Sequence, residues 1–207
     1  MDFIFLFLGL ATISLFTYAI RSIKDGAILL VWASIVSFLA SKSLFANFPF
    51  LLAIALIVTL LIGLFVYKRL KQRPVNQSIL LAIHIVRIPV ELMLYQLYLA
   101  GRVPVLMTYD GWNFDVFIGC SALFLFLLSL LIGFSKLIGV LRVWSVIGIV
   151  SLASVVIVAV LSSPIPIQQF AFDQPNTALL YFPYVLLPCL IVPIVFLSHF
   201  LLLKSMR

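Results

Sequence analysis

Long apolar stretches alternate with short polar breaks along the whole chain. A helix that crosses a bilayer needs about 20 predominantly apolar residues, and the sequence can be cut into seven such segments. They lie at about 3–20, 26–44, 49–67, 77–100, 114–134, 143–162 and 177–203. The pattern predicts an all-α integral membrane protein, in which a bundle of seven transmembrane helices forms a single domain over residues 1–207.

The composition agrees with this fold class. Hydrophobic residues make up 65% of the chain and charged residues only 9%, whereas a soluble domain carries about 25% charged residues. The sequence begins Met1-Asp2 and runs directly into apolar residues. Because a signal peptide would start with a basic region, we interpret the first apolar stretch as a retained span.

The basic residues predict an orientation. The breaks after the first, third and fifth spans, together with the C-terminal tail, hold ten Lys and Arg residues, whereas the intervening breaks hold only Lys42 and Arg102. Such a bias is typical of cytoplasmic loops, so we expect the N-terminus outside and the C-terminus inside. The net charge of +7 is then explained by helix orientation, and the sequence contains no nucleic-acid-binding motif.

One face of the fourth span carries a row of ionisable and tyrosine side chains at membrane depth. These are His84, Arg87, Glu91, Tyr95 and Tyr98, which fall within an arc of roughly 80° on a helix. Ionisable groups inside a membrane are costly and usually functional, so this face is a candidate ligand-binding or proton-relay site. Arg87 and Glu91 are four residues apart, the spacing at which side chains pair along a helix. A buried ion pair that only fixes helix packing, with tyrosines at the interface, is the structural alternative.

The outer loops and the last span add further candidates. We expect Asp110, Asn113, Asp115 and Asp173 to line the entrance of an outward-facing polar pocket between the fourth, fifth and seventh spans. The repeated prolines of the last span predict a bent or locally opened helix.

No cofactor or metal site is predicted as the leading interpretation. His84 and His199 fall in the same leaflet and could together ligate a haem b, but only if the fourth and seventh spans touch. The two histidines lack the spacing of a zinc site, and no lysine lies deep in the last span to hold retinal. Cys120 and Cys189 lie in apolar runs and are interpreted as core residues.

Two strings resemble a family of uncharacterised bacterial seven-helix inner-membrane proteins. They are Arg87-Ile-Pro-Val-Glu91 and Met107-Thr-Tyr-Asp-Gly-Trp-Asn-Phe-Asp115, and the Phe170 to Asn176 loop and the His199 helix are similar too. The resemblance covers roughly the C-terminal two-thirds of the chain. It implies a multi-pass protein of the bacterial inner membrane and carries no established activity.

The leading hypothesis is a membrane protein that binds or translocates a small solute or a proton through a polar pocket. Enzymatic activity is not expected. The alternatives are a haem-binding electron-transfer protein or membrane enzyme that uses His84 and His199, and a structural partner subunit. The expected partners are the lipid bilayer and a small-molecule ligand, without nucleic acid, and the sequence predicts no oligomeric state.

Overall fold

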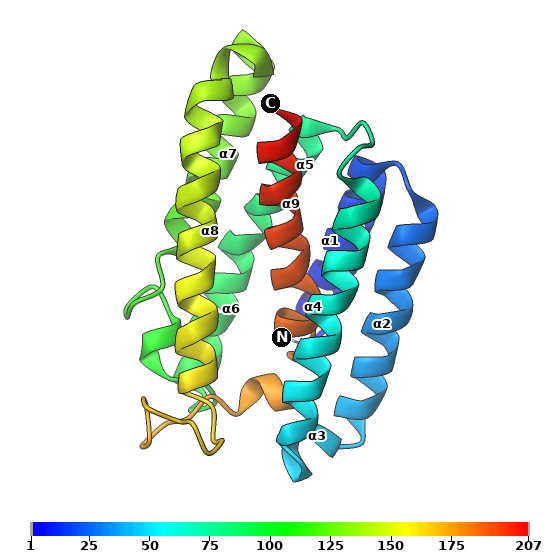
Figure 1. The fold of residues 1–207 in the computed structure, drawn as a ribbon. Helices are drawn as coiled ribbons and strands as arrows, with labels where there is room; N and C mark the ends of the chain where they lie inside the picture. Colours follow the sequence, from blue (N-terminus) through cyan, green and yellow to red (C-terminus); the bar gives the residue numbers. More distant parts are fainter. Residues whose placement is uncertain (1, 207) are drawn as a thin grey trace.

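Seven helices of membrane-spanning length and hydropathy form the fold, as predicted (Figure 1). The computed structural model describes residues 2–206, and within that range it contains helices and turns but no strand. Five of the spans lie close to their predicted positions. These are α1 (Asp2–Ile20), α2 (Ile23–Ser41), α4 (Phe50–Leu70), α7 (Asp115–Ile132) and α8 (Ile138–Leu161), the last preceded by a 3-10 turn, η3 (Phe134–Leu137); a short α3 (Leu44–Asn47) joins α2 to α4.

The fourth span is interrupted rather than continuous. It consists of α5 (Gln77–Ile83), the 3-10 turn η1 (His84–Val86) and α6 (Arg87–Leu99). Pro89 has no N–H for the carbonyl of Ile85 four residues earlier, and its ring crowds that carbonyl. A tightened 3-10 turn just before a proline is one way in which the backbone relieves this conflict. The break places His84 at the junction of the two helical pieces.

The last span starts later than predicted. Residues 177–185 form the 3-10 turn η4 (Ala178–Leu180) and further turns. The membrane helix then begins with the π-helical segment η5 (Leu187–Ile191), which leads into α9 (Val192–Ser205). The predicted start at 177 is therefore wrong. Pro183 and Pro188 lack the N–H groups that a continuous helix needs, and π-turns occur at such points. The predicted local opening of this helix is confirmed.

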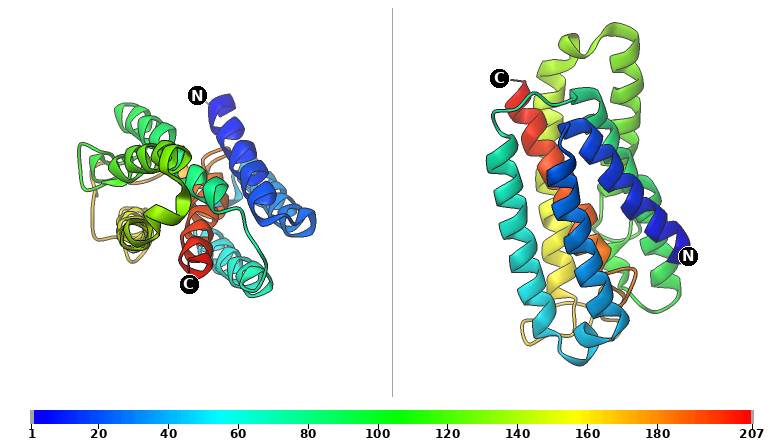
Figure 2. Two further views of the ribbon diagram at one scale, coloured as in Figure 1. Left: turned by 90° about the horizontal axis from the view of Figure 1, so that it is seen from above. Right: turned by 90° about the vertical axis from the view of Figure 1, so that its right-hand side faces the viewer.

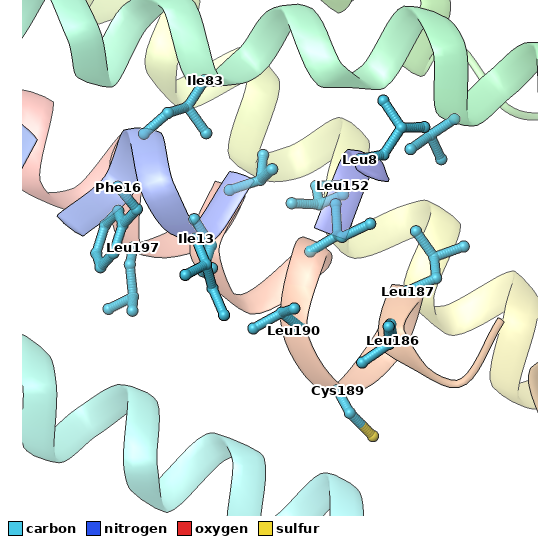
Figure 3. Close-up of a cluster of buried hydrophobic side chains, with 14 of the residues drawn as sticks. Leu8, Ile13, Phe16, Ile83, Leu152, Leu186, Leu187, Cys189, Leu190 and Leu197 are labelled. Atoms are coloured by element: carbon cyan, nitrogen blue, oxygen red, sulfur yellow. The ribbon is translucent and has the colours of Figure 1, made fainter. Parts of the chain in front are cut away.

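The helix α9 lies at the centre of the bundle. Figures 1 and 2 show it between α4 and α8, with α1 and α5 on its other sides. In the most apolar stretch of Leu187–Ser205, which comprises η5 and α9, 61% of the residues are buried, against 17% in the corresponding stretch of α4. Figure 3 shows Leu187 and Leu190 of η5 in one buried cluster with Ile13 of α1 and Leu152 of α8. A helix whose side chains are mostly apolar all round suits this position, because it is surrounded by other helices.

The outer face of the bundle is apolar, and most of the charged residues lie at its two ends. Phe3 and Leu131, for example, are 88% and 82% exposed, as expected for side chains that face lipid. The basic breaks lie at the same end as the C-terminus (Figure 1). At this end Arg69 Nε is 2.9 Å from Asp25 Oδ1, and Arg142 donates to the carbonyl of Met206. We refer to the end that carries the C-terminus as the basic end and to the opposite end as the acidic end.

The orientation of these ends in the membrane stays a prediction, and cysteine labelling tests it. A thiol introduced as Asp110→Cys at the acidic end is expected to react with a membrane-impermeant maleimide added to intact cells. Lys136→Cys at the basic end is expected to react only after permeabilisation. The parent chain is the control. Its two cysteines, Cys120 and Cys189, lie within spans, so it is expected not to react with the reagent. The reverse labelling pattern would invert the orientation.

Candidate functional site

Six polar side chains meet inside the bundle and define the buried polar cluster. Each is at most 4% exposed. They come from the broken fourth span, from the loop before α7 and its first turn, and from α9. The members are His84, Arg87, Glu91, Asn113, Asp115 and His199. A set of ionisable groups buried together in a membrane protein marks a functional-site candidate, because each would be costly there alone.

Arg87 makes three polar contacts within the bundle. Its Nη1 donates to Asp115 Oδ1 at 3.1 Å, and its Nη2 donates to the carbonyl of Gly148 at 3.2 Å. The same Nη2 lies 3.2 Å from His199 Nε2. Because a guanidinium can only donate, His199 Nε2 accepts here, and a neutral His199 then carries its proton on Nδ1.

The predicted ion pair between Arg87 and Glu91 is wrong, because the salt bridge of Arg87 is with Asp115. Gly119 on α7 makes this contact possible. A Cβ at Gly119 would lie 2.8 Å from the Ile88 side chain and 3.2 Å from Arg87 Cβ. The missing side chain lets α7 approach α6 closely, which brings the first turn of α7 beside the guanidinium.

Asn113 connects the two carboxyl residues. Its Nδ2 donates to Glu91 Oε1 at 2.6 Å and to the carbonyl of Met107 at 3.0 Å. Its Oδ1 accepts from the backbone N–H of Asp115 at 3.0 Å. In the described part of the chain, Glu91 Oε2 has no hydrogen-bond partner. Asn113 therefore fixes both the start of α7 and one oxygen of Glu91, while the other oxygen stays available.

His84 and His199 are in direct contact, so the fourth and seventh spans touch. Their ring centroids are 3.9 Å apart, and Trp144 of α8 lies 5.1 Å from each ring. Both rings are fully buried. Within residues 2–206 neither nitrogen of His84 has a partner, nor has Nδ1 of His199. Imidazole nitrogens are strong polar groups, so this pair has unused hydrogen-bonding capacity.

The histidine pair does not fit a haem. Two axial imidazoles must have the iron and the porphyrin plane between them, but these rings are at van der Waals contact. Gly148 also packs against His199, since a Cβ there would lie 2.4 Å from the ring atom Nε2. Among residues 2–206 no three His, Cys, Asp or Glu side chains are close enough to hold a metal ion.

The predicted entrance residues separate into two groups. Asn113 and Asp115 are buried in the cluster rather than at an entrance, because the loop before α7 returns into the bundle. Asp110 and Asp173 are exposed at the acidic end. Tyr95 is half-buried and stacks on Tyr109 with ring centroids 4.8 Å apart, outside the cluster.

Sequence reasoning missed the contribution of α8. Ser151 donates to Asp115 Oδ1 at 2.7 Å, Gly148 provides a carbonyl to Arg87, and Trp144 packs on both histidines. Serine and glycine are frequent in membrane helices. The ionisable residue of α8, Arg142, lies near its start at the basic end, so no ionisable residue marked the part of α8 that meets the cluster.

Comparison with known proteins places the chain in a family. Neither the curated proteins nor the solved structures contain a match to it. The model of one family, described as a domain of unknown function (DUF8737), matches residues 45–207. This range contains all six members of the buried polar cluster and most of the chain. The chain therefore belongs to the DUF8737 family and is a multi-pass membrane protein with seven candidate spans.

Proposed function

We propose that this protein binds a proton in the buried polar cluster and transfers it across the membrane. The observation that carries the proposal is an excess of carboxyl groups over guanidinium groups in a sealed site. The cluster holds two carboxyl groups, Glu91 and Asp115, but a single arginine, Arg87, which pairs with Asp115. Two contacting histidines lie next to this pair.

Charge balance supports a bound proton. With Arg87 and both carboxyl groups ionised and the histidines neutral, the cluster carries one net negative charge. An uncompensated charge at the centre of a membrane costs roughly 2.5–3.5 kcal/mol on insertion scales. One proton, on Glu91 or on the histidine pair, neutralises that charge. The cluster can therefore hold one exchangeable proton.

The positions of the groups suggest their roles. The fourth span runs from the basic to the acidic end, and Glu91 lies seven residues beyond His84, or about 10 Å along the helix. Glu91 is therefore the group nearer the acidic end, and the histidine pair is nearer the basic end. The Arg87–Asp115 ion pair lies between them.

In this proposal, the contact between Arg87 and His199 is broken when a proton arrives at the histidine pair. A proton on His199 Nε2 would place a donor against the donor Nη2, 3.2 Å away, and two positive charges would repel each other. Proton arrival at the histidine pair is therefore expected to displace the guanidinium and so to couple proton transfer to movement of α9 against α6.

A proton suits the site better than a solute does. The cluster side chains are at most 4% exposed, and a cleft of about 690 Å³ elsewhere in the bundle is lined by none of them. A solute would need a cavity beside the polar groups, whereas a proton needs only groups that accept and donate it.

Proton flux in proteoliposomes tests the proposal. Glu91→Gln removes the exchangeable proton but keeps the shape of the side chain and an oxygen for Asn113. It is expected to slow the uptake of protons after an acid pulse by about tenfold or more, measured with a trapped pH-sensitive dye. Asp110→Asn is the matched control, because it makes the same change at an exposed carboxyl group.

The comparison also separates the functional from the structural interpretation. A folded Glu91→Gln protein that conducts protons like the parent chain would leave the cluster as a packing device and would refute the proposal. Wild-type vesicles no more permeable to protons than protein-free vesicles would refute it as well.

A further inference from the structure

A long cleft opens on the side of the bundle, away from the buried polar cluster. It has a volume of about 690 Å³ and lies between α4 and α8, with η5 and α9 as its floor. In Figure 1, α4 and α8 stand apart and α9 runs between them. Its walls are mostly apolar, formed by residues such as Leu56, Leu60, Val155, Ala159, Pro188 and Phe196.

The cleft follows α4 over most of the membrane thickness. Its lining on α4 runs from Leu52 to Tyr67, which is roughly 22 Å at 1.5 Å per residue. The hydrocarbon core of a bilayer is about 30 Å thick. A cleft of this length and apolarity is suited to one extended hydrocarbon chain.

The end of the cleft at Ser163 and Asn176 carries an unused hydrogen-bond acceptor. Asn176 is 1% exposed, and its Nδ2 donates to the carbonyl of Ala159 at 3.1 Å and to Ser163 Oγ at 3.3 Å. Its Oδ1 has no partner in residues 2–206. A buried acceptor without a donor is costly and uncommon. By contrast, the hydroxyl of Thr59 already donates to Ala55 and accepts from Trp32.

The lining also restricts the charge of a ligand. Among the described residues that form the cleft there is no Lys, Arg, His, Asp or Glu. A phosphate or ammonium head group would therefore enter without a counter-charge, which is unfavourable in an apolar site. A neutral head group that donates a hydrogen bond has no such penalty.

We propose that this cleft binds an uncharged, single-chain lipid with a hydroxyl head group. Its hydrocarbon chain lies along α4 and α9, and its hydroxyl donates to Asn176 Oδ1, which is buried in this structure and turns toward the cleft on binding. Monoacylglycerols and long-chain alcohols belong to this class. The site shares no residue with the buried polar cluster, so it stands or falls independently of proton transfer.

Native mass spectrometry of the detergent-solubilised full chain, titrated with 1-monooleoylglycerol, tests the site. Gly63 lines the cleft, and a Cβ there meets no atom within 4 Å, so the side chain of Gly63→Leu has space to extend into the cleft. It is expected to weaken binding about tenfold or more, since it occupies the volume of the ligand. Gly139→Leu is the matched control, because Gly139 also faces open space but lies outside the cleft. Equal binding by the two variants would overturn the proposal.

A second measurement tests the head group. The parent chain is expected to prefer 1-monooleoylglycerol over methyl oleate, which lacks the hydroxyl donor, by about threefold to tenfold. Asn176→Leu is expected to abolish that preference. Equal binding of the two lipids by the parent chain, or tighter binding of the anionic analogue oleoyl lysophosphatidate, would overturn the assignment of a neutral hydroxyl head group.

Discussion

Replacing Arg87 with methionine is expected to lower the free energy of unfolding by about 3–5 kcal/mol, because it leaves a buried carboxylate without its counter-charge. Asp115 is 4% exposed and loses the Nη1 donor at 3.1 Å. The carbonyl of Gly148 and His199 Nε2 lose their donor at the same time. Methionine keeps much of the aliphatic volume, so the change reports on the charge rather than on a cavity. Thermal unfolding in detergent, followed by tryptophan fluorescence, measures the loss.

The partner variant identifies the cause. Asp115→Asn removes the carboxylate and keeps the shape of the side chain, so the double variant Arg87→Met/Asp115→Asn is expected to recover part of the stability. Residues that share one network show such non-additivity. If Arg87→Met unfolds like the parent chain, or if the two substitutions are simply additive, then the Arg87–Asp115 pair does not hold the helices together.

Adding a single methyl group at Gly148 is expected to cost about 1–3 kcal/mol through overpacking. A Cβ at this position would lie 2.4 Å from both Cε1 and Nε2 of His199. The two helices α8 and α9 must then separate, or the imidazole must turn, and either movement breaks the 3.2 Å contact between His199 and Arg87. We expect Gly148→Ala to lower the melting temperature and, if proton transfer uses the histidine pair, to lower proton flux too.

Gly139→Ala, earlier on the same helix, is the control for Gly148→Ala. A Cβ there meets no atom within 4 Å, so alanine is expected to be neutral or to stabilise the helix by up to about 1 kcal/mol. Adding His199→Ala to Gly148→Ala removes the ring that clashes, and the double variant is expected to be more stable than the sum of the single effects. Additive losses would show that the imidazole is not the obstacle.

The spans could be predicted from the sequence because each needs only a sufficient run of apolar residues. The breaks within spans were harder to place. Pro89 predicts a kink, but the 3-10 turn at His84–Val86 depends on how the neighbouring helices hold the backbone. In the last span the prolines predicted an opened helix, yet its regular part begins only at Leu187, because residues 177–185 form turns.

The members of the buried polar cluster were named from the sequence, but their pairing was not. His84, Arg87 and Glu91 stood out as ionisable residues in an apolar span, and Asp115 stood out near the start of the next. Helix spacing favoured Glu91 as the partner of Arg87. The observed partner is Asp115, because Gly119 lets α7 approach α6, and neither the close approach nor the role of α8 has a local signal.

The sequence by itself determined that this is a membrane bundle of seven helices and which of its side chains are too polar to face lipid. Both follow from the cost of exposing polar groups to hydrocarbon, which depends on each residue and its immediate neighbours. Only the tertiary structure decided that Arg87 binds Asp115, that His84 and His199 touch, and that α4 and α8 leave a cleft beside α9. These contacts join residues far apart in the chain, and close packing selects them through small residues such as Gly119 and Gly148 rather than through any periodic pattern.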